Sequence, residues 1–248
     1  MFKKLTHKKI EFTPSMERAI DYPPTPVKFN LPTWYKDLAS NINGAKNTAK
    51  ERAMSNNAVP FTVKRCVPVS DYLTSGYLLK TFTDILISQN VERNPVDLQW
   101  SLPIGEDLNY IIGGHPHNQC PIKFEHKNRD YIKFFPGWKI KTPPGYSCMF
   151  YQNFYDQEDR FVLFPAIVDT DKYDALISFP GYIKTTEADF KIPAGTPLVI
   201  AYPFKRDDWN MKINDEPISD LKSNAFKRFG QHFENVYRNF FHSKKRFD

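Results

Sequence analysis

Two short stretches of this 248-residue chain carry side chains that could do chemistry. In the first, His115 and His117 stand two residues apart, and Glu125 and His126 follow soon after. Imidazoles and carboxylates are common metal ligands, so the His-x-His spacing suggests the start of a cupin-type metal site that would need a further ligand. The alternative is a loop in which these histidines only form hydrogen bonds.

The second stretch is Asp169-Thr170-Asp171, with Tyr173 close behind, after a short apolar run. Two carboxylates at this spacing are candidates for acid–base chemistry. The alternative is that both are turn residues that satisfy local backbone donors. The chain has no Gly-x-Ser-x-Gly nucleophile motif and no Walker or Rossmann glycine pattern, so the sequence supports neither nucleophilic catalysis nor those nucleotide-binding loops.

The three cysteines are odd in number and far apart in the sequence, at Cys66, Cys120 and Cys148. Without a Cys-x-x-Cys pair, they predict buried or idle thiols in a reducing compartment. A disulfide framework or a zinc site is not expected.

The elements that would position these side chains are predicted to be short β-strands. The chain has 20 prolines, only 10 glycines and 15% aromatic residues, which favours sheet over a helix bundle. Turn signals at 143–145, 169–171 and 193–195 separate apolar runs. We therefore expect a mainly β, antiparallel fold with an irregular loop at 111–121 and strands at 61–67, 77–87, 131–141, 146–154, 161–168, 174–183, 190–192 and 197–204.

Both ends of the chain differ from this β region. Residues 1–33 are rich in proline and predict an extended arm that lies along the surface or reaches a neighbour. A short helix is expected over 33–55, with Thr33 as its N-cap. Apolar residues from Leu221 to Phe240 recur with helical spacing and predict an amphipathic C-terminal helix, packed on the sheet or docking a second subunit. The aromatic side chains expected to make interactions are Trp34, Tyr35, Phe229, Phe233 and Tyr237.

The formal net charge of +6 comes from lysines and arginines that gather at the two termini. They are interpreted as solubilising tails, or as contacts to an acidic partner. Nucleic acid is not the favoured partner, because no named nucleic-acid-binding motif is present. No apolar run approaches the length of about 18 residues that a spanning helix needs, and residues 1–20 lack the apolar segment of a signal peptide.

The stretch 140–204 resembles the core of the trimeric dUTPase and dCTP deaminase superfamily, a β-clip fold. Ile140, Gly145 and Tyr146 match the family's Ile-x-x-Pro-x-Gly-Tyr strand entry. Residues 166–173, AIVDTDKY, follow its Gly-Val-Ile-Asp-x-Asp-Tyr motif with one insertion, and residues 192–200 follow the course of a later motif.

This resemblance implies candidate site residues. Asp171 would orient an attacking water, with Asp169 and Tyr173 beside it, and a divergent nucleotide pyrophosphatase or deaminase would use Mg²⁺. Gly145, Tyr146 and Gly195 would contact the ligand. The family's Pro-Arg-Ser phosphate motif is missing after Tyr146, and so are the arginine and glutamine of the later motif, so the cationic donors that a triphosphate needs are not evident.

The whole chain also resembles an uncharacterised protein family of marine tailed phages. The resemblance rests on LPTWY at 31–35, Cys66-Val67-Pro68, the 115–119 loop, KTPPGYS at 141–147 and PFKR at 203–206. It implies a phage origin but no established activity. Together with the terminal arms and the missing catalytic motifs, it predicts a non-enzymatic phage protein, a virion structural or assembly component in the virion or the host cytoplasm. We expect a homo-oligomer without a cofactor, a trimer by analogy with the resembled core, in contact with other virion proteins and not with a membrane.

These expectations divide the chain into three parts. Residues 1–58 form the arm and short helix. Residues 59–212 form the β domain, with the β-clip-like core at 138–206. Residues 213–248 form the C-terminal helix and basic tail.

Overall fold

The computed structural model describes residues 8–42, 61–90, 92, 97–103, 111–116, 119, 131–215 and 237–248. The chain forms two compact units. Unit 1 comprises Met1–Asn30 and Gly76–Arg206, and unit 2 comprises Leu31–Ser75 and Asp207–Asp248. The three-part division predicted from the sequence stays a prediction.

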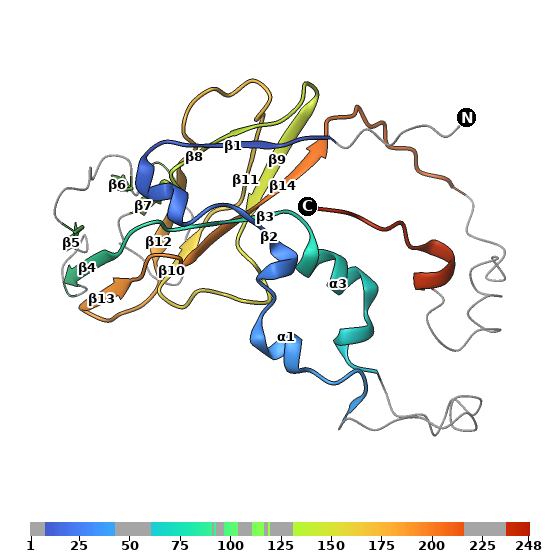
Figure 1. Cartoon of the computed structure of the whole chain (residues 1–248), viewed down its shortest axis with the longest axis horizontal. Helices are drawn as coiled ribbons and strands as arrows, with labels where there is room; N and C mark the ends of the chain where they lie inside the picture. Colours follow the sequence, from blue (N-terminus) through green and yellow to red (C-terminus); the bar gives the residue numbers. More distant parts are fainter. Residues whose placement is uncertain are drawn as a thin grey trace. The chain divides into compact units, whose positions relative to one another are not determined.

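Unit 1 is built from antiparallel sheets (Figure 1), so the expectation of a mainly β, antiparallel fold with few helices is confirmed. Its largest sheet has five strands in the order β11-β9-β14-β3-β2. These strands are β2 (Thr25–Pro26), β3 (Tyr77–Lys80), β9 (Tyr146–Tyr151), β11 (Ala166–Val168) and β14 (Pro197–Lys205). The nine-residue β14 lies at the centre and pairs with β3 on one side and β9 on the other.

Three smaller sheets complete unit 1. A four-stranded sheet has the order β10-β12-β7-β6, a three-stranded sheet has the order β13-β4-β5, and β1 pairs with β8. Their bounds are β1 (Glu11–Pro14), β4 (Ile85–Asn90), β5 (Asp97–Ser101), β6 (Ile112–His115), β7 (Tyr131–Phe134), β8 (Trp138–Lys141), β10 (Phe161–Leu163), β12 (Phe179–Ile183) and β13 (Asp189–Ile192).

The core of unit 1 follows from the alternation of apolar and polar side chains along these strands. In β4 every second residue from Ile85 is buried and the residues between are exposed. The largest fully buried side chains are aromatic: Phe82, Phe134, Phe150, Phe161 and Phe179. A second, smaller cluster of Val27, Leu78 and Ile200 lies against Tyr151, apart from the main core.

The N-terminal segment contributes to unit 1 itself. Glu11–Pro14 pairs with β8, and Thr25–Pro26 pairs with β3. Between them the short 3₁₀-helix η1 (Glu17–Asp21) buries Ala19 completely in the core. The proline-rich segment, expected as an extended arm, therefore supplies two short strands to the sheets of unit 1. Both strands lie at sheet edges, where a missing N–H is tolerated.

One expected strand and one expected loop differ in the structure. Residues 61–67 alternate in residue type, but they hold a 3₁₀-helix, η5 (Val63–Arg65), and the start of helix α3 (Val67–Thr74). Pro68 suits the first turn of α3, because its missing N–H would have no helical partner there. Conversely, part of the loop expected at 111–121 is strand β6, in which Gly113 and Gly114 pair with β7.

Unit 2 contains the remaining helical elements. Helix α1 spans only Thr33–Asp37 and follows the short 3₁₀-helix η2 (Val27–Phe29) of unit 1. Its N-cap position is occupied by Pro32, so the expectation that Thr33 caps this helix is wrong. Leu38 is already extended. Asp71 of α3 accepts a hydrogen bond from Lys245 Nζ at 2.6 Å and lies 3.1 Å from His242 Nε2. The predicted C-terminal helix falls mostly outside the described residues, which resume with a π-helical turn, η8 (Tyr237–Phe241).

Candidate functional site

The turn between β8 and β9 presents backbone donors and acceptors to two other segments. Gly145 adopts a φ of +83°, a left-handed conformation that favours glycine, and Tyr146 N–H bonds to Pro143 O at 3.2 Å to close the turn. The Gly145 N–H then points outward and donates to Asp171 Oδ2 at 2.8 Å. Its carbonyl accepts from the Arg206 N–H at 2.9 Å.

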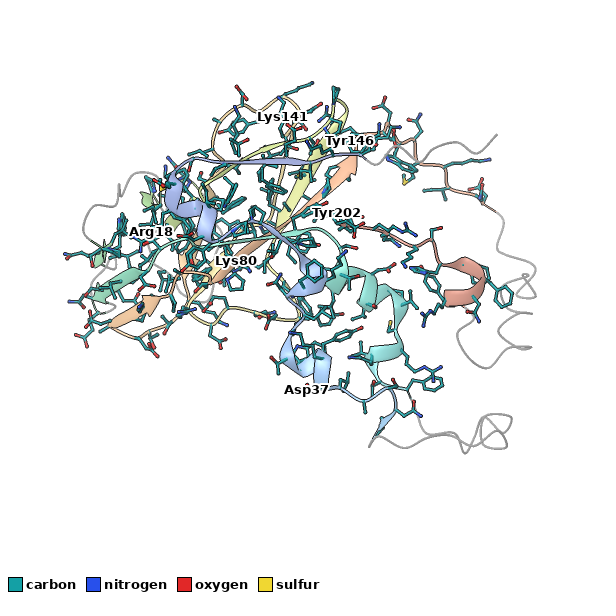
Figure 2. The ribbon with its side chains drawn as sticks, in the orientation of Figure 1. Arg18, Asp37, Lys80, Lys141, Tyr146 and Tyr202 are labelled. Atoms are coloured by element: carbon teal, nitrogen blue, oxygen red, sulfur yellow. The ribbon has the colours of Figure 1, made fainter. Side chains whose placement is uncertain are left out.

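Arg206 lies directly after β14 and holds this turn together. Its guanidinium donates to both carboxylate oxygens of Asp171, with Nη1 2.7 Å from Oδ1 and Nη2 on Oδ2. Nη1 also contacts Tyr146 O at 3.1 Å and Ser147 Oγ at 2.9 Å (Tyr146 is labelled in Figure 2). The Asp171 side chain is only 5% exposed. We call Gly145, Ser147, Asp169, Asp171 and Arg206 the carboxylate–arginine cluster.

Asp169 occupies the open side of this cluster. Ser147 Oγ donates to its Oδ1 at 2.7 Å, and Arg206 Nη1 lies 3.2 Å from the same oxygen. The Asp169 side chain is 52% exposed. The cluster therefore holds two carboxylates and one guanidinium, an arrangement that disfavours the approach of a further anion.

The pKa values of the cluster follow from these contacts. Hydrogen bonds from Arg206 hold the pKa of Asp171 far below its usual range; desolvation opposes this, and the Gly145 N–H adds to the lowering. Asp171 raises the pKa of Arg206 in return. Asp171 is therefore a fixed anion and not a group poised to exchange protons near neutral pH.

Thr170 turns away from the two aspartates that flank it. It is buried, and its hydroxyl lies 2.7 Å from Thr142 Oγ1 and 3.5 Å from Cys148 Sγ. Burial raises the pKa of Cys148 to about 11, although the hydrogen bond from Thr170 opposes this. Cys148 is thus an inert buried thiol, as expected, while Cys66 is exposed and Cys120 lies outside the described residues.

Replacing Asp171 with asparagine should weaken the dependence of the melting temperature on pH in the acid range. The pKa of Asp171 is depressed on folding, so its contribution is present above the unfolded value of 3.8 and disappears as the pH falls through the folded value. The variant should melt at a lower temperature than wild type at pH 7, and the difference should shrink below about pH 4.

Thermal melts at pH 7, 4 and 2.5 would measure this effect. Asp21→Asn, at the exposed end of η1, is the matched control and should leave the profile unchanged. A constant difference between Asp171→Asn and wild type at all three pH values would contradict the assignment of Asp171 as a charged partner of Arg206.

The structure brings together only some of the residues expected at the site. Gly145, Asp169 and Asp171 belong to the cluster, and the Tyr146 carbonyl accepts a hydrogen bond from its Arg206. Tyr173 is connected to it through its backbone N–H, which bonds to Asp169 O at 2.8 Å, and its side chain is 45% exposed. Gly195 lies elsewhere, in a turn with a φ of +83° beside the ring of Tyr22.

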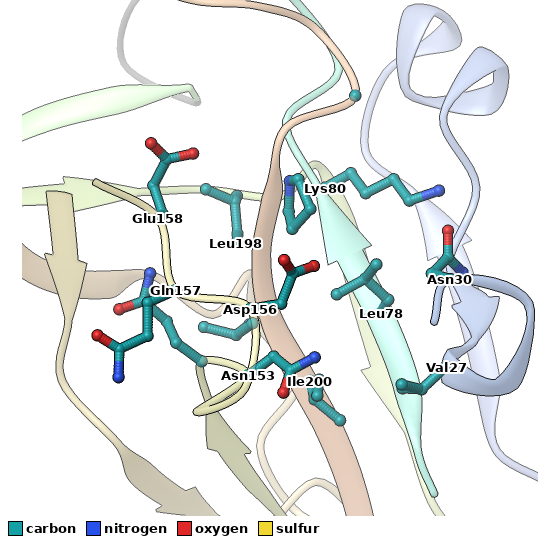
Figure 3. Close-up of a pocket in the computed structure, with 14 residues that line it drawn as sticks. Val27, Asn30, Leu78, Lys80, Asn153, Asp156, Gln157, Glu158, Leu198 and Ile200 are labelled. Carbon is teal, nitrogen blue, oxygen red and sulfur yellow. The ribbon is translucent and has the colours of Figure 1, made fainter. Parts of the chain in front are cut away.

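Gly195 lines a cavity of about 270 Å³ in unit 1. Its floor is apolar and includes Val27, Leu78 and Ile200. Figure 3 shows polar side chains on two sides: the 153–158 loop on one, Asn30 and Lys80 on the other.

The two carboxylates of that loop are in different electrostatic states. Burial and the charge of Glu158 raise the pKa of Asp156. For Glu158, burial acts in the same direction, but hydrogen bonds from Arg160 outweigh it and lower the pKa. Arg160 Nε and Nη2 bind the Glu158 oxygens at 2.6 and 2.7 Å. Lys80 is the one cation among the described residues that line the cavity, so the cavity is a mixed polar pocket and not a cationic cradle for phosphates.

The histidines predicted to hold a metal are not joined by further ligands in the described part of the chain. His115 is the last residue of β6 and is paired with Tyr131, whereas His117, Glu125 and His126 lie outside the described residues. Among the residues that the structure describes, no group of three or more His, Cys, Asp or Glu side chains is arranged to hold a metal ion.

The aromatic side chains expected to make interactions are found in different environments. Tyr35 is buried in unit 2, with Lys64 Nζ 4.7 Å from the centre of its ring, whereas Trp34 is 41% exposed. Tyr237 is also 41% exposed, and Phe229 and Phe233 lie outside the described residues.

Sequence reasoning missed the role of Arg206. The segment after Tyr146 was expected to lack a cationic partner, and it does so locally, but β14 pairs with β9 and carries Arg206 beside Tyr146. The only signal in the sequence was an arginine directly after an expected strand, together with an aspartate-containing turn at 169–171. That signal is weak without knowledge of the strand pairing.

Comparisons with known proteins did not identify a relative. No protein-family model matches the chain, and no curated protein or solved structure matches it either.

Proposed function

We propose that this chain is a non-enzymatic assembly protein of a phage particle that forms a homo-oligomer through its β core. The observation that carries the proposal is the engagement of Asp171. Both of its oxygens accept hydrogen bonds from Arg206, and one also accepts from the Gly145 N–H. Asp171, the residue expected to orient a catalytic water, therefore links its own turn to Gly145 and to Arg206.

Large exposed apolar side chains support the assembly part of this proposal. Trp209 is 88% exposed, Met211 87% and Ile213 74%, and Ile167 on the edge strand β11 is 63% exposed. Trp209, Met211 and Ile213 are neighbours along the chain, and grouped exposed apolar side chains mark interaction surfaces. The phage origin, the β-clip-like class of the core and contacts with other virion proteins rest on the sequence resemblances.

A membrane does not enter the proposal. No helix in the described residues is long and apolar enough to cross a bilayer. The basic termini could contact nucleic acid, but nucleic acid is not the favoured partner.

A divergent pyrimidine nucleotide pyrophosphatase or deaminase is the second candidate, favoured by one observation. Asp169 is half exposed beside Ser147 and Arg206, where a ligand could reach it. Mg²⁺ fits this cluster poorly, because hydrogen-bond donors already occupy both oxygens of Asp171 and only Asp169 remains open. The cupin-like alternative has no supporting observation in the described residues.

Nucleotide turnover tests the choice between the two candidates. Purified protein would be incubated with the deoxynucleoside triphosphates and Mg²⁺, and pyrophosphate, phosphate and base deamination would be read together. We expect no turnover, and we expect a mass above that of the monomer in light scattering. Turnover that disappears in Asp171→Ala but survives in Asp174→Ala, an exposed carboxylate paired with Lys139, would overturn the proposal.

A further inference from the structure

Residues 207–215 have the pattern of a β-strand whose apolar face is uncovered. The sequence DDWNMKIND places Trp209, Met211 and Ile213 at alternate positions, so they would share one face of an extended strand. These three side chains are 74–88% exposed. The segment adopts no helix and, among the described residues, pairs with no strand. We call it the 207–215 arm.

The arm starts from a fixed point. It follows Arg206, whose backbone N–H bonds to Gly145 O and whose guanidinium binds Asp171 and Asp169. Asp169 in turn follows directly on β11. The carboxylate–arginine cluster thus holds the root of the arm at the end of the five-stranded sheet.

The five-stranded sheet offers one edge suited to another strand. In the described part of the chain its outer strands are β2 and β11. Strand β2 contains Pro26, which cannot donate a hydrogen bond to an added strand. Strand β11 contains no proline, and Ile167 lies opposite Met149 of β9, which is itself 40% exposed. Unprotected edges of this kind are templates for strand addition.

We propose that the 207–215 arm of one copy adds to strand β11 of a second copy and lays Trp209, Met211 and Ile213 beside Ile167 and Met149. This inference rests on the proposed homo-oligomer and specifies its interface. Backbone hydrogen bonds to the free edge would supply affinity, and the apolar side chains on one face would fix the register.

One observation favours a second copy over the chain's own β11. The arm follows β14, which is separated from β11 by β9, and only Asp207 and Asp208 lie between the root and Trp209. An arm on its own β11 would have to cross β9 and reverse within two residues, without glycine or proline.

Each copy then has one donor, the 207–215 arm, and one acceptor, strand β11. The contact is therefore heterologous and predicts a closed ring or an open chain of copies. A donor-defective variant would substitute Trp209, Met211 and Ile213 with serine. Its matched control would substitute the alternate positions Asn210, Lys212 and Asn214 with serine.

An acceptor-defective variant would be Ile167→Asp, which places a negative charge where the acidic arm must pack. Ile20→Asp is its control, because Ile20 is similarly exposed, at 56%, on η1. Circular dichroism and thermal melts would verify that all variants fold.

Light scattering and native mass spectrometry over a range of concentrations give the decisive readout. We expect wild type and both controls to form oligomers, and each defective variant to fall to the 29.0 kDa monomer. The two defective variants mixed together should form a 1:1 heterodimer, because the acceptor-defective variant still has an arm and the donor-defective variant still has an open β11.

Two outcomes would overturn the inference and are distinguishable. A wild-type protein that stays monomeric at all concentrations would overturn the proposed oligomer as well. An oligomeric wild type whose mass persists in either defective variant, or a mixture of the two variants that stays monomeric, would overturn only the strand addition.

Discussion

Replacing Phe134 with alanine is expected to lower the free energy of unfolding of unit 1 by about 3–5 kcal/mol. Phe134 is fully buried in β7, which pairs with β12 on one side and β6 on the other. Its ring lies 5.0 Å from that of Phe161. The substitution would remove this contact and leave a cavity between rigid strands that cannot close around it.

Because single domains are stable by only about 5–15 kcal/mol, this loss should be visible as a large shift in the urea midpoint. Phe29→Ala is the control: Phe29 is 69% exposed, and its removal should change the free energy by less than about 0.5 kcal/mol. Equal midpoints for the two variants would show that Phe134 does not belong to the core as described.

Replacing Gly181 with alanine should destabilise unit 1 by about 1–3 kcal/mol or more, through overpacking. Gly181 lies in β12 opposite Leu163 of β10. A Cβ atom at this position would lie 2.0 Å from Val162 O and 2.9 Å from Leu163 Cα. Both contacts are to backbone atoms, so the two strands would have to separate.

Gly114→Ala provides the matched control within another strand of the same sheet. The nearest atom to its added Cβ would be Trp100 Cη2 at 3.5 Å, an ordinary contact. Its effect on urea unfolding should be small. If Gly181→Ala were as stable as Gly114→Ala, the close pairing of β10 with β12 would be wrong.

Much of the sheet structure was predictable, because local alternation and turn chemistry agree with the pairing. In β4 the alternation of buried and exposed residues is regular, and the turn signals at 143–145 and 193–195 each correspond to a glycine with a φ of +83°. The helix α3 was missed because its sequence, VPVSDYLT, alternates over its first residues like a strand. Strand β6 was missed because two consecutive glycines favour a loop locally, and only pairing with β7 makes them a strand.

The candidate site was predictable only in part, for a similar reason. The resemblance grouped Gly145 with Asp171, and the structure places the Gly145 N–H on the Asp171 carboxylate. It also grouped Gly195 with them, although Gly195 lines a separate cavity. Arg206 was missed because its effect on Asp171 depends on tertiary pairing, which no local pattern encodes.

The position of β14 in the five-stranded sheet has a consequence for how the protein is made. The central strand of that sheet is the last of its strands to be synthesised, and its neighbour β3 precedes it by more than a hundred residues. Until Pro197–Lys205 leaves the ribosome, β3 and β9 lack the strand that lies between them and pairs with both. Folding of this sheet should therefore be slow and should begin only after β14 has emerged, and β3 and β9 remain exposed to wrong pairings until then.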